Sequence, residues 1–142
     1  MNKHIFNLSL TATYVPSDNQ MDTLEVTVLG EDGWEPLELS TMTPGFLIYV
    51  YAMFTCQHLY LRTNGTERGL VFASSKGHIL VETSAEWLLE KVDVGFQVNL
   101  AAGEASSDDV DYIVSRMQRC PVSKNLPAGI AVQTAVEFNH DR

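Results

Sequence analysis

The sequence predicts an α+β fold, because segments that alternate polar and apolar residues are interrupted by two segments with helical signals. The alternating segments lie at the beginning, in the middle and at the end of the chain. One helical segment is apolar on nearly every side, and the other is amphipathic. Because 142 residues is about the length of one domain, we expect residues 1–142 to form a single domain.

The N-terminal part of the chain predicts an antiparallel meander. Three alternating segments are separated by the turn-forming stretches VPSDNQ and GEDG. The apolar positions that share a face in these segments are Leu8, Leu10, Ala12 and Tyr14, then Leu24, Val26 and Val28, then Leu37 and Leu39. A period of two indicates half-buried strands, and the third strand is expected to be short.

Residues 43–65 predict a long central helix. Thr43 is a candidate cap, Pro44 suits the first helical position, and Asn64-Gly65 is a typical stop signal. Since this segment is apolar nearly all round, it must be buried on every side. A chain of this size has little material to cover such a helix, so we infer that a second subunit supplies part of the cover.

Further strands are expected after the central helix. Residues 70–82 read as two short apolar runs around a Ser-Ser-Lys-Gly turn, which predicts a hairpin. Residues 86–100 alternate and predict one longer strand or two, and Ile130 to Phe138 predicts a final strand.

A second, amphipathic helix precedes the final strand. Ser106 or Ser107 is expected to cap it, and Asp108 and Asp109 suit the positive end of the helix dipole. Its apolar stripe has helical spacing and ends at Cys120, just before a proline that stops the helix.

Composition and charge argue against several classes of partner. The formal net charge of −9 disfavours binding to nucleic acid and to anionic membranes. The longest apolar run, residues 46–54, is too short for a membrane span, and the N-terminal residues lack the apolar core of a signal peptide. We therefore expect a cytoplasmic protein, in which two cysteines are free thiols or a transient redox pair.

No metal or cofactor site is expected. Cys56 and His58 are two residues apart on a helix, so they point to different faces, and the other histidines are scattered. The chain contains no CxxC, HExxH, GxGxxG, GxxxxGK or GxSxG motif, which leaves metal binding, nucleotide binding and hydrolase chemistry without support.

The two cysteines have a structural and a chemical interpretation. Cys56 lies in the middle of the apolar helix, where a lone cysteine is usually a small core residue. A reactive Cys56 thiolate would need a cation that the fold brings in. Cys120 lies at a helix C-terminus, where the dipole disfavours a thiolate, so packing is again the simpler interpretation.

The stretch CPVSKNL at residues 120–126 resembles the C-terminal signature of the OsmC/Ohr family. Cys56, in YVYAMFTCQHLYLR, occupies the place of that family's first cysteine, and the order of elements agrees along nearly the whole chain. The chain is thus similar to a divergent member of the family. The resemblance implies an intertwined α+β homodimer whose central helices are buried at the interface.

The resemblance also implies peroxiredoxin-like chemistry in the response to oxidative stress. Cys56 would attack an organic hydroperoxide and become a sulfenic acid, and Cys120 would condense with it to form a disulfide. A dithiol reductant would then reopen the disulfide. In this interpretation Cys56 and Cys120 are the catalytic residues.

The sequence departs from the family pattern at the residues that activate the first cysteine. The peroxidases of the family use an N-terminal arginine to hold the thiolate and a glutamate near the start of the central helix to hold the arginine. Here residues 1–61 contain no arginine, and residues 40–66 contain no acid. Arg62 or Arg68 is a candidate substitute, and Arg62 would reach only the partner's Cys56.

Three functions remain open from the sequence. The first is a thiol peroxidase that uses the Cys56–Cys120 pair. The second is a non-catalytic dimer that binds a small apolar ligand or senses oxidation, with no cation near Cys56. The third is a structural fold in which both cysteines are relicts. His58 and Tyr60 are expected to be a solvated or interface residue and a core residue, respectively.

Overall fold

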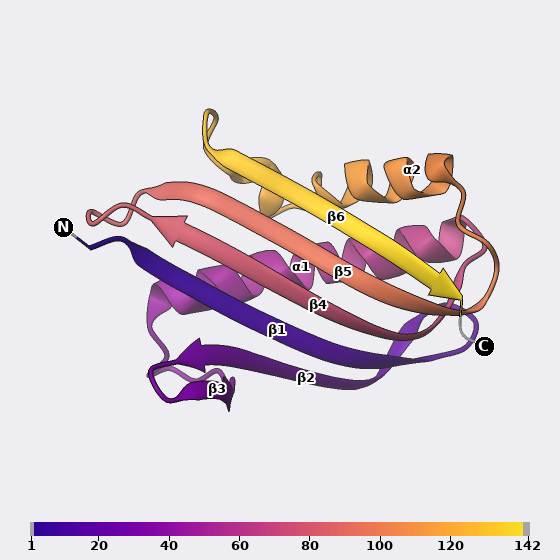
Figure 1. Ribbon diagram of the computed structural model, residues 1–142, viewed down its shortest axis with the longest axis horizontal. Helices are drawn as coiled ribbons and strands as arrows, with labels where there is room; N and C mark the ends of the chain where they lie inside the picture. Colours follow the sequence, from indigo (N-terminus) through magenta and orange to yellow (C-terminus); the bar gives the residue numbers. More distant parts are fainter. Residues whose placement is uncertain (1, 141–142) are drawn as a thin grey trace.

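The computed structural model describes residues 2–140, which form a six-stranded sheet with two α-helices on one of its faces (Figure 1). The elements in chain order are β1 (His4–Val15), β2 (Gln20–Gly30), β3 (Gly33–Pro36), α1 (Gly45–Glu67), β4 (Val71–Thr83), β5 (Leu89–Ala102), α2 (Ser107–Met117), the 3-10 turn η1 (Ser123–Asn125) and β6 (Ala131–His140). The strand order is β3-β2-β1-β4-β5-β6, and every neighbouring pair is antiparallel except β5 and β6. The predicted α+β fold is therefore confirmed, including the N-terminal meander and the C-terminal strand.

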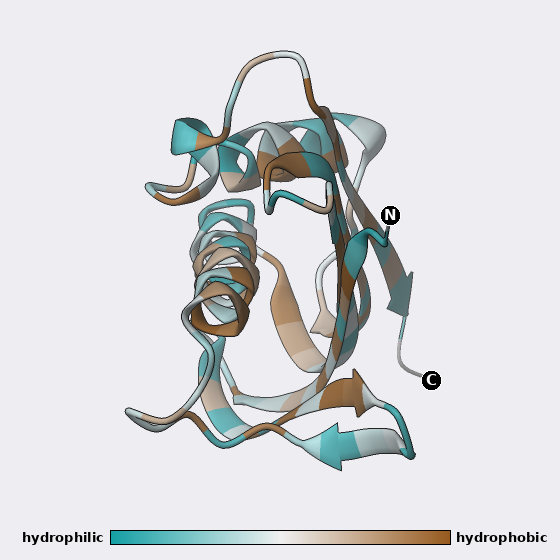
Figure 2. Ribbon diagram, turned by 90° about the vertical axis from the view of Figure 1, so that its left-hand side faces the viewer, coloured by the Kyte–Doolittle hydropathy of each residue, from teal (hydrophilic) through white to brown (hydrophobic). Residues whose placement is uncertain are grey.

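The core lies between the sheet and the two helices, which occupy the same side of the sheet (Figure 2). Alternation along the strands points residues such as Leu8, Leu10 and Val94 toward the helices, where they are buried. The opposite face is polar, and its hydroxyl groups pair across strands, as Ser9 does with Thr27 at 2.6 Å. Since only one face of the sheet is covered, the chain presents one buried and one open sheet surface.

Helix α1 is buried on one side only in the single chain. Its buried residues recur at helical spacing and are Val50, Met53, Phe54, Gln57, His58, Leu61, Asn64 and Gly65. The other side remains apolar yet exposed, with Leu59 44% and Ile48 37% accessible. The expectation that the helix is buried on every side is thus not met within one chain. No helix within residues 2–140 has both the length and the apolarity needed to cross a membrane.

Both ends of α1 differ from the sequence prediction. Pro44 occupies the N-cap position, and no side chain, including that of Thr43, caps the helix. At the other end the helix passes through Asn64 and Gly65 to Glu67. A Cβ at Gly65 would lie 2.6 Å from the ring of Phe72, so this glycine permits close packing instead of stopping the helix.

The predicted hairpin at residues 70–82 is wrong, because β4 is one continuous strand. The Ser-Ser-Lys-Gly stretch contains small residues for a packing reason. Ser75 faces the core and hydrogen-bonds to Tyr14, while a Cβ at Gly77 would lie 2.5 Å from the ring of Phe96. Small residues that resemble a turn signal in the sequence therefore make room for aromatic rings from neighbouring strands.

The third strand lies earlier than predicted. It comprises Gly33–Pro36, directly after the turn, whereas Leu37 and Leu39 follow it. Leu37 continues the pairing only through its N–H, which donates to the carbonyl of Val26 at 2.9 Å.

Helix α2 forms as predicted and places Cys120 just beyond its last turn. Ser106 caps it through a reciprocal capping box with Asp109, and Ile113 and Met117 are buried. Residues 118–130 then lead through η1 to β6, which pairs in parallel with β5. This connection brings the CPVSK stretch back over α1, the helix that carries Cys56.

Candidate functional site

The fold brings Cys56 and Cys120 together. Cys56 lies on α1 and is partly buried, whereas Cys120 follows α2 and is fully buried. The Cys120 side chain lies near enough to Cys56 to raise the pKa of its thiol, and both cysteines are free, not joined in a disulfide. Two cysteines that are distant in the sequence therefore form one site, which we call the cysteine site.

Backbone amides of the segment after Cys120 face both sulfur atoms. The N–H of Ser123 donates to Sγ of Cys120 at 3.4 Å, and the backbone of Val122 lowers the pKa of the Cys56 thiol, as a nearby N–H donor does. The N–H of Lys124 also donates to the carbonyl of Cys120 at 2.9 Å, which closes the segment into a turn. Amide donors of this kind stabilise negative charge on sulfur and on oxidised sulfur species.

Electrostatics at Cys56 nevertheless favour the neutral thiol. Burial raises the pKa of Cys56 to about 11, helped by the neighbouring Cys120 side chain, which favours the protonated Cys56 thiol as a donor, and opposed by the Val122 backbone. Within residues 2–140, no cation is among the groups that shift this pKa. The arrangement therefore resembles a protected dithiol more than an activated nucleophile.

The candidate substitute arginines lie elsewhere in the single chain. Arg68 pairs with Asp109 at 3.5 Å and stacks over the ring of Tyr112 at 4.0 Å. Arg62 is half-buried near Tyr14, and burial lowers the pKa of its guanidinium. Its buried Nε has no hydrogen-bond partner within residues 2–140. Neither arginine is among the groups that shift the pKa of Cys56 in its own chain.

A second polar group, which we call the Tyr14 cluster, consists of Tyr14, His58 and Ser75, with Arg62 beside it. The Tyr14 hydroxyl hydrogen-bonds to Nε2 of His58 at 2.7 Å and to the hydroxyl of Ser75. Burial lowers the pKa of His58 to about 3, an effect to which Arg62 adds, and burial raises the pKa of Tyr14 to about 12. Both groups are therefore neutral at pH 7.

The Tyr14 cluster corrects the sequence prediction for His58. This residue is 2% exposed and lies in the core, so it is neither solvated nor at a surface. Tyr60 packs half-buried against the core, as predicted. Sequence reasoning missed the cluster because Ser75 resembled a turn residue and Tyr14 resembled an ordinary apolar strand position. The available signal was a histidine two residues from a cysteine on an otherwise apolar helix.

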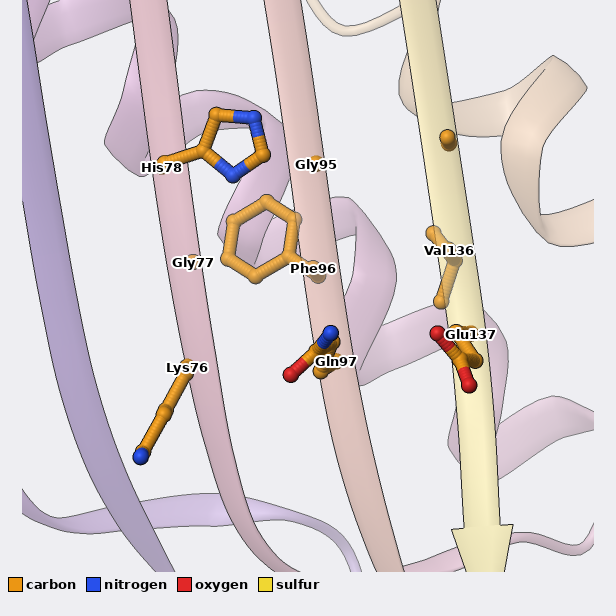
Figure 3. Close-up of a pocket in the computed structure, with 9 residues that line it drawn as sticks. Lys76, Gly77, His78, Gly95, Phe96, Gln97, Val136 and Glu137 are labelled. Atoms are coloured by element: carbon orange, nitrogen blue, oxygen red, sulfur yellow. The ribbon is translucent and has the colours of Figure 1, made fainter.

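A separate hollow of ≈ 370 Å³ lies on the open face of the sheet (Figure 3). Lys76 and His78 of β4 and Glu137 of β6 line it, and the ring of His78 leans over Gly95. A Cβ at Gly95 would lie 2.5 Å from that ring, so the glycine allows the ring to rest on the strand. Because the hollow is on the side away from the helices, it does not communicate with the cysteine site.

Metal ligands do not gather in the described part of the chain. Within residues 2–140, no group of three histidine, cysteine, aspartate or glutamate side chains is placed to hold a metal ion. The chemistry available at the cysteine site is therefore that of the two sulfurs and the amides around them.

Comparison with known proteins bears on the fold. No protein-family model matches the sequence, and no curated protein matches it significantly. Solved structures do match. An OsmC-like protein from Mycoplasma pneumoniae has a TM-score of 0.53 at 9% identity, over 93% of this chain and 96% of that one.

Two further solved structures are also similar in fold to this chain. An OsmC-like hydroperoxide resistance protein from Jannaschia sp. CCS1 has a TM-score of 0.53 at 8% identity, over 86% of each chain. A putative osmotic stress induced and detoxification response protein from Psychrobacter arcticus has a TM-score of 0.56 at 8% identity, over 89% of this chain and 94% of that one. The resemblance inferred from CPVSK and the central cysteine is thus confirmed for the fold, and this chain has the fold of the OsmC-like proteins.

Proposed function

We propose that this protein reduces organic hydroperoxides through a Cys56–Cys120 dithiol, as a slow thiol peroxidase. The observation that carries the proposal is that Cys120 lies near enough to Cys56 to raise the pKa of its thiol, beside the backbone of residues 122 and 123. The similarity in fold to an OsmC-like hydroperoxide resistance protein is consistent with this assignment.

The proposed reaction has three steps. The Cys56 thiolate attacks the terminal oxygen of the hydroperoxide, the O–O bond breaks, and a proton completes the alcohol, leaving Cys56 as a sulfenic acid. The Cys120 thiol then displaces water from that sulfenic acid and forms the disulfide. A dithiol reductant, which a reducing compartment such as the cytoplasm supplies, returns both thiols and becomes a disulfide itself.

The electrostatics of the single chain predict that the first step is slow. With the pKa of Cys56 near 11, about one thiol in 10⁴ is ionised at pH 7, against a few per cent for an ordinary cysteine. A cation beside Cys56 would raise that fraction. Arg62, whose Nε lacks a partner within residues 2–140, is our candidate for a cation supplied by another subunit.

The exposed side of α1 supports a homodimer as part of the proposal. Leu59 and Ile48 on this side, together with half-buried Leu24 and Val26 on β2, leave apolar surface open beside the helix. Apolar surface of this kind is typical of an interface between subunits. A second copy of the chain would cover it and bring another Arg62 near the interface.

A second candidate function is a redox sensor that is oxidised once and turns over slowly. The raised pKa of Cys56, which no cation within residues 2–140 is found to oppose, favours this alternative. In both functions Cys56 and Cys120 form a disulfide, and the two differ in the rate at which the cycle repeats.

Steady-state turnover separates the two functions. We would mix the purified protein with cumene hydroperoxide and excess dithiothreitol, and follow peroxide loss, with Cys56→Ser and Arg62→Gln as variants. A peroxidase gives many turnovers that Cys56→Ser abolishes and Arg62→Gln slows. A single turnover that is not repeated supports the sensor, and no peroxide loss above that of the Cys56→Ser variant contradicts both.

A further inference from the structure

Gln57 is buried beside the cysteine site although it is a polar residue. It follows Cys56 directly in α1, and its side chain is 0% exposed. Successive residues on a helix are about 100° apart, so Gln57 points away from Cys56. A buried amide needs hydrogen-bond partners, and those of Gln57 come from two other segments of the chain.

The Gln57 amide joins three elements. Its Nε2 donates to Oγ of Ser123 in η1 at 3.0 Å, and its Oε1 accepts from Oγ1 of Thr134 in β6 at 3.0 Å. Ser123 and Thr134 are themselves buried. Buried hydrogen bonds of this kind have well-defined geometry, and breaking one leaves a polar group unpaired.

Ser123 connects Gln57 to the sulfur atoms. Its side chain is held by Gln57, while its own N–H donates to Sγ of Cys120 at 3.4 Å. The backbone of the adjacent residue, Val122, lies near enough to the Cys56 thiol to lower its pKa. The residue that follows the first cysteine therefore holds the turn that follows the second.

We propose that Gln57 is a positioning residue that holds the Cys120 turn against Cys56, so that the disulfide closes with little rearrangement. The inference rests on the proposed Cys56–Cys120 redox pair and adds the element that sets its geometry. Ring closure is favoured when the two reacting groups are held close together, because less conformational entropy is lost.

Equilibrium with dithiothreitol tests this role without any peroxide. Oxidised dithiothreitol takes two hydrogens from the Cys56 and Cys120 thiols, which form the disulfide, and becomes the reduced dithiol. The fraction of disulfide is measured by alkylation and mass spectrometry over a range of reduced-to-oxidised ratios. The rate at which Cys120 is alkylated in the fully reduced protein is a second measurement.

We would compare Gln57→Met, which keeps the length of the side chain, with the milder Ser123→Ala and Thr134→Val. We expect the disulfide equilibrium constant of Gln57→Met to fall about tenfold, because the buried hydroxyls of Ser123 and Thr134 lose their hydrogen-bond partner. Cys120 should be alkylated faster in the same variant. Ser123→Ala should shift the disulfide equilibrium less, in the same direction. The double variant Gln57→Met/Ser123→Ala should shift it by less than the sum of the two single shifts in free energy.

Ser75→Ala is the matched control. Ser75 is also a buried, hydrogen-bonded serine, but it belongs to the Tyr14 cluster. The Ser75→Ala variant should be less stable, but its disulfide equilibrium and its rate of Cys120 alkylation should be unchanged. Equal shifts in Ser75→Ala and Ser123→Ala, or no shift in any of the Gln57, Ser123 and Thr134 variants, would overturn the proposal.

The two proposals can fail separately. If the wild-type protein consumes no hydroperoxide while the dithiothreitol equilibrium shifts as expected, the positioning role of Gln57 stands and the peroxidase function fails. If the wild type forms no disulfide with either oxidised dithiothreitol or cumene hydroperoxide, both proposals fail.

Discussion

Two polar clusters lie beside α1, and only one of them contains a group that reagents can reach. The cysteine site holds Cys56, Cys120 and the turn after Cys120, and Cys56 is partly accessible. The Tyr14 cluster holds Tyr14, His58 and Ser75, and each of these is at most 6% exposed. The clusters start from neighbouring positions, Cys56 and His58, on the same helix.

Burial affects the titratable groups of the two clusters in the same direction, but with different consequences. In both clusters burial is the largest cause of the pKa shift, and in both it favours the neutral form. At the Tyr14 cluster the neutral groups hydrogen-bond to one another and stabilise the fold. At the cysteine site the neutral thiol retains access to solvent, so it stays available for slow chemistry when it ionises.

The largest expected effect concerns the pH dependence of Cys56. Below its pKa of about 11, the thiolate fraction and the alkylation rate should rise about tenfold for each pH unit. Between pH 7 and pH 9 we expect about a 100-fold increase in the rate of reaction with iodoacetamide, without levelling. Site-resolved mass spectrometry measures this rate, and a plateau near pH 8.5, typical of an ordinary thiol, would contradict it.

Removal of the Cys120 sulfur tests one cause of the raised pKa of Cys56. The Cys120 thiol helps to raise the pKa of Cys56, so Cys120→Ala should lower that pKa and speed alkylation of Cys56 at a given pH. Burial remains in this variant, so the pKa should stay above that of an unfolded cysteine. Slower alkylation of Cys56 in Cys120→Ala than in the wild type would contradict the assigned cause.

The next effect is a loss of stability in acid through His58. The folded pKa is about 3 and the unfolded value is about 6.5, so the unfolded chain binds a proton first as the pH falls. Stability should therefore be full above pH 6.5 and fall by about 1.4 kcal/mol per pH unit below it, about 2 kcal/mol by pH 5. Urea unfolding at pH 7, 6 and 5 measures this slope.

Two variants test the assignment to His58. His58→Gln should flatten the slope between pH 6.5 and pH 5, even if its stability at pH 7 is lower. His78 lies exposed on the open face of the sheet, so His78→Gln should keep the wild-type slope. An unchanged slope in His58→Gln would show that another group controls the acid response.

A smaller effect is expected when the centre of the Tyr14 cluster is removed. Tyr14→Phe keeps the ring and deletes the hydroxyl that joins His58 to Ser75. Leaving these partners unpaired should lower the free energy of unfolding by about 1–3 kcal/mol. Because the cluster is separate from the cysteine site, the Cys56–Cys120 disulfide equilibrium with dithiothreitol should not change, and a shift of tenfold would contradict that separation.

The smallest effect should come from the cap of α2. Ser106→Ala removes the hydroxyl that accepts from the N–H of Asp109, keeps the bond from the residue 106 N–H to the Asp109 carboxylate, and should cost about 1 kcal/mol, measured by urea unfolding. The variant tests whether a modest loss of stability in the helix before Cys120 is enough to disturb the cysteine site. We expect no change in the disulfide equilibrium, in contrast to Ser123→Ala.

Periodicity in the sequence predicted most elements of the fold. The alternation in β1 and the capped, amphipathic α2 are local patterns that the tertiary structure keeps. The errors fall at small residues. Gly65 resembled a stop signal, yet it lies against the ring of Phe72 in the strand that follows the helix. The stretch around Ser75 resembled a turn, yet it lies against Tyr14 and Phe96 from neighbouring strands. Such packing has no local signal.

The sequence pointed to the two cysteines of the candidate site, but it did not predict the groups that surround them. The family resemblance pointed to Cys56 and Cys120, whose contact depends on the path from α2 to β6. The missing arginine and glutamate were visible in the sequence, and the raised pKa of Cys56 is what their absence leads one to expect. The role of Gln57 was not visible, because its partners, Ser123 and Thr134, are joined to it only by the fold.

Thiol counting after stoichiometric oxidation tests the central claim most directly. One equivalent of cumene hydroperoxide is added to the reduced protein, samples are quenched by alkylation over seconds to minutes, and free thiols are counted by mass spectrometry. Cys56→Ser and Cys120→Ser serve as controls. We expect loss of both thiols as one intramolecular disulfide, faster at pH 9 than at pH 7 and absent from either variant. Persistence of both free thiols at both pH values would contradict it.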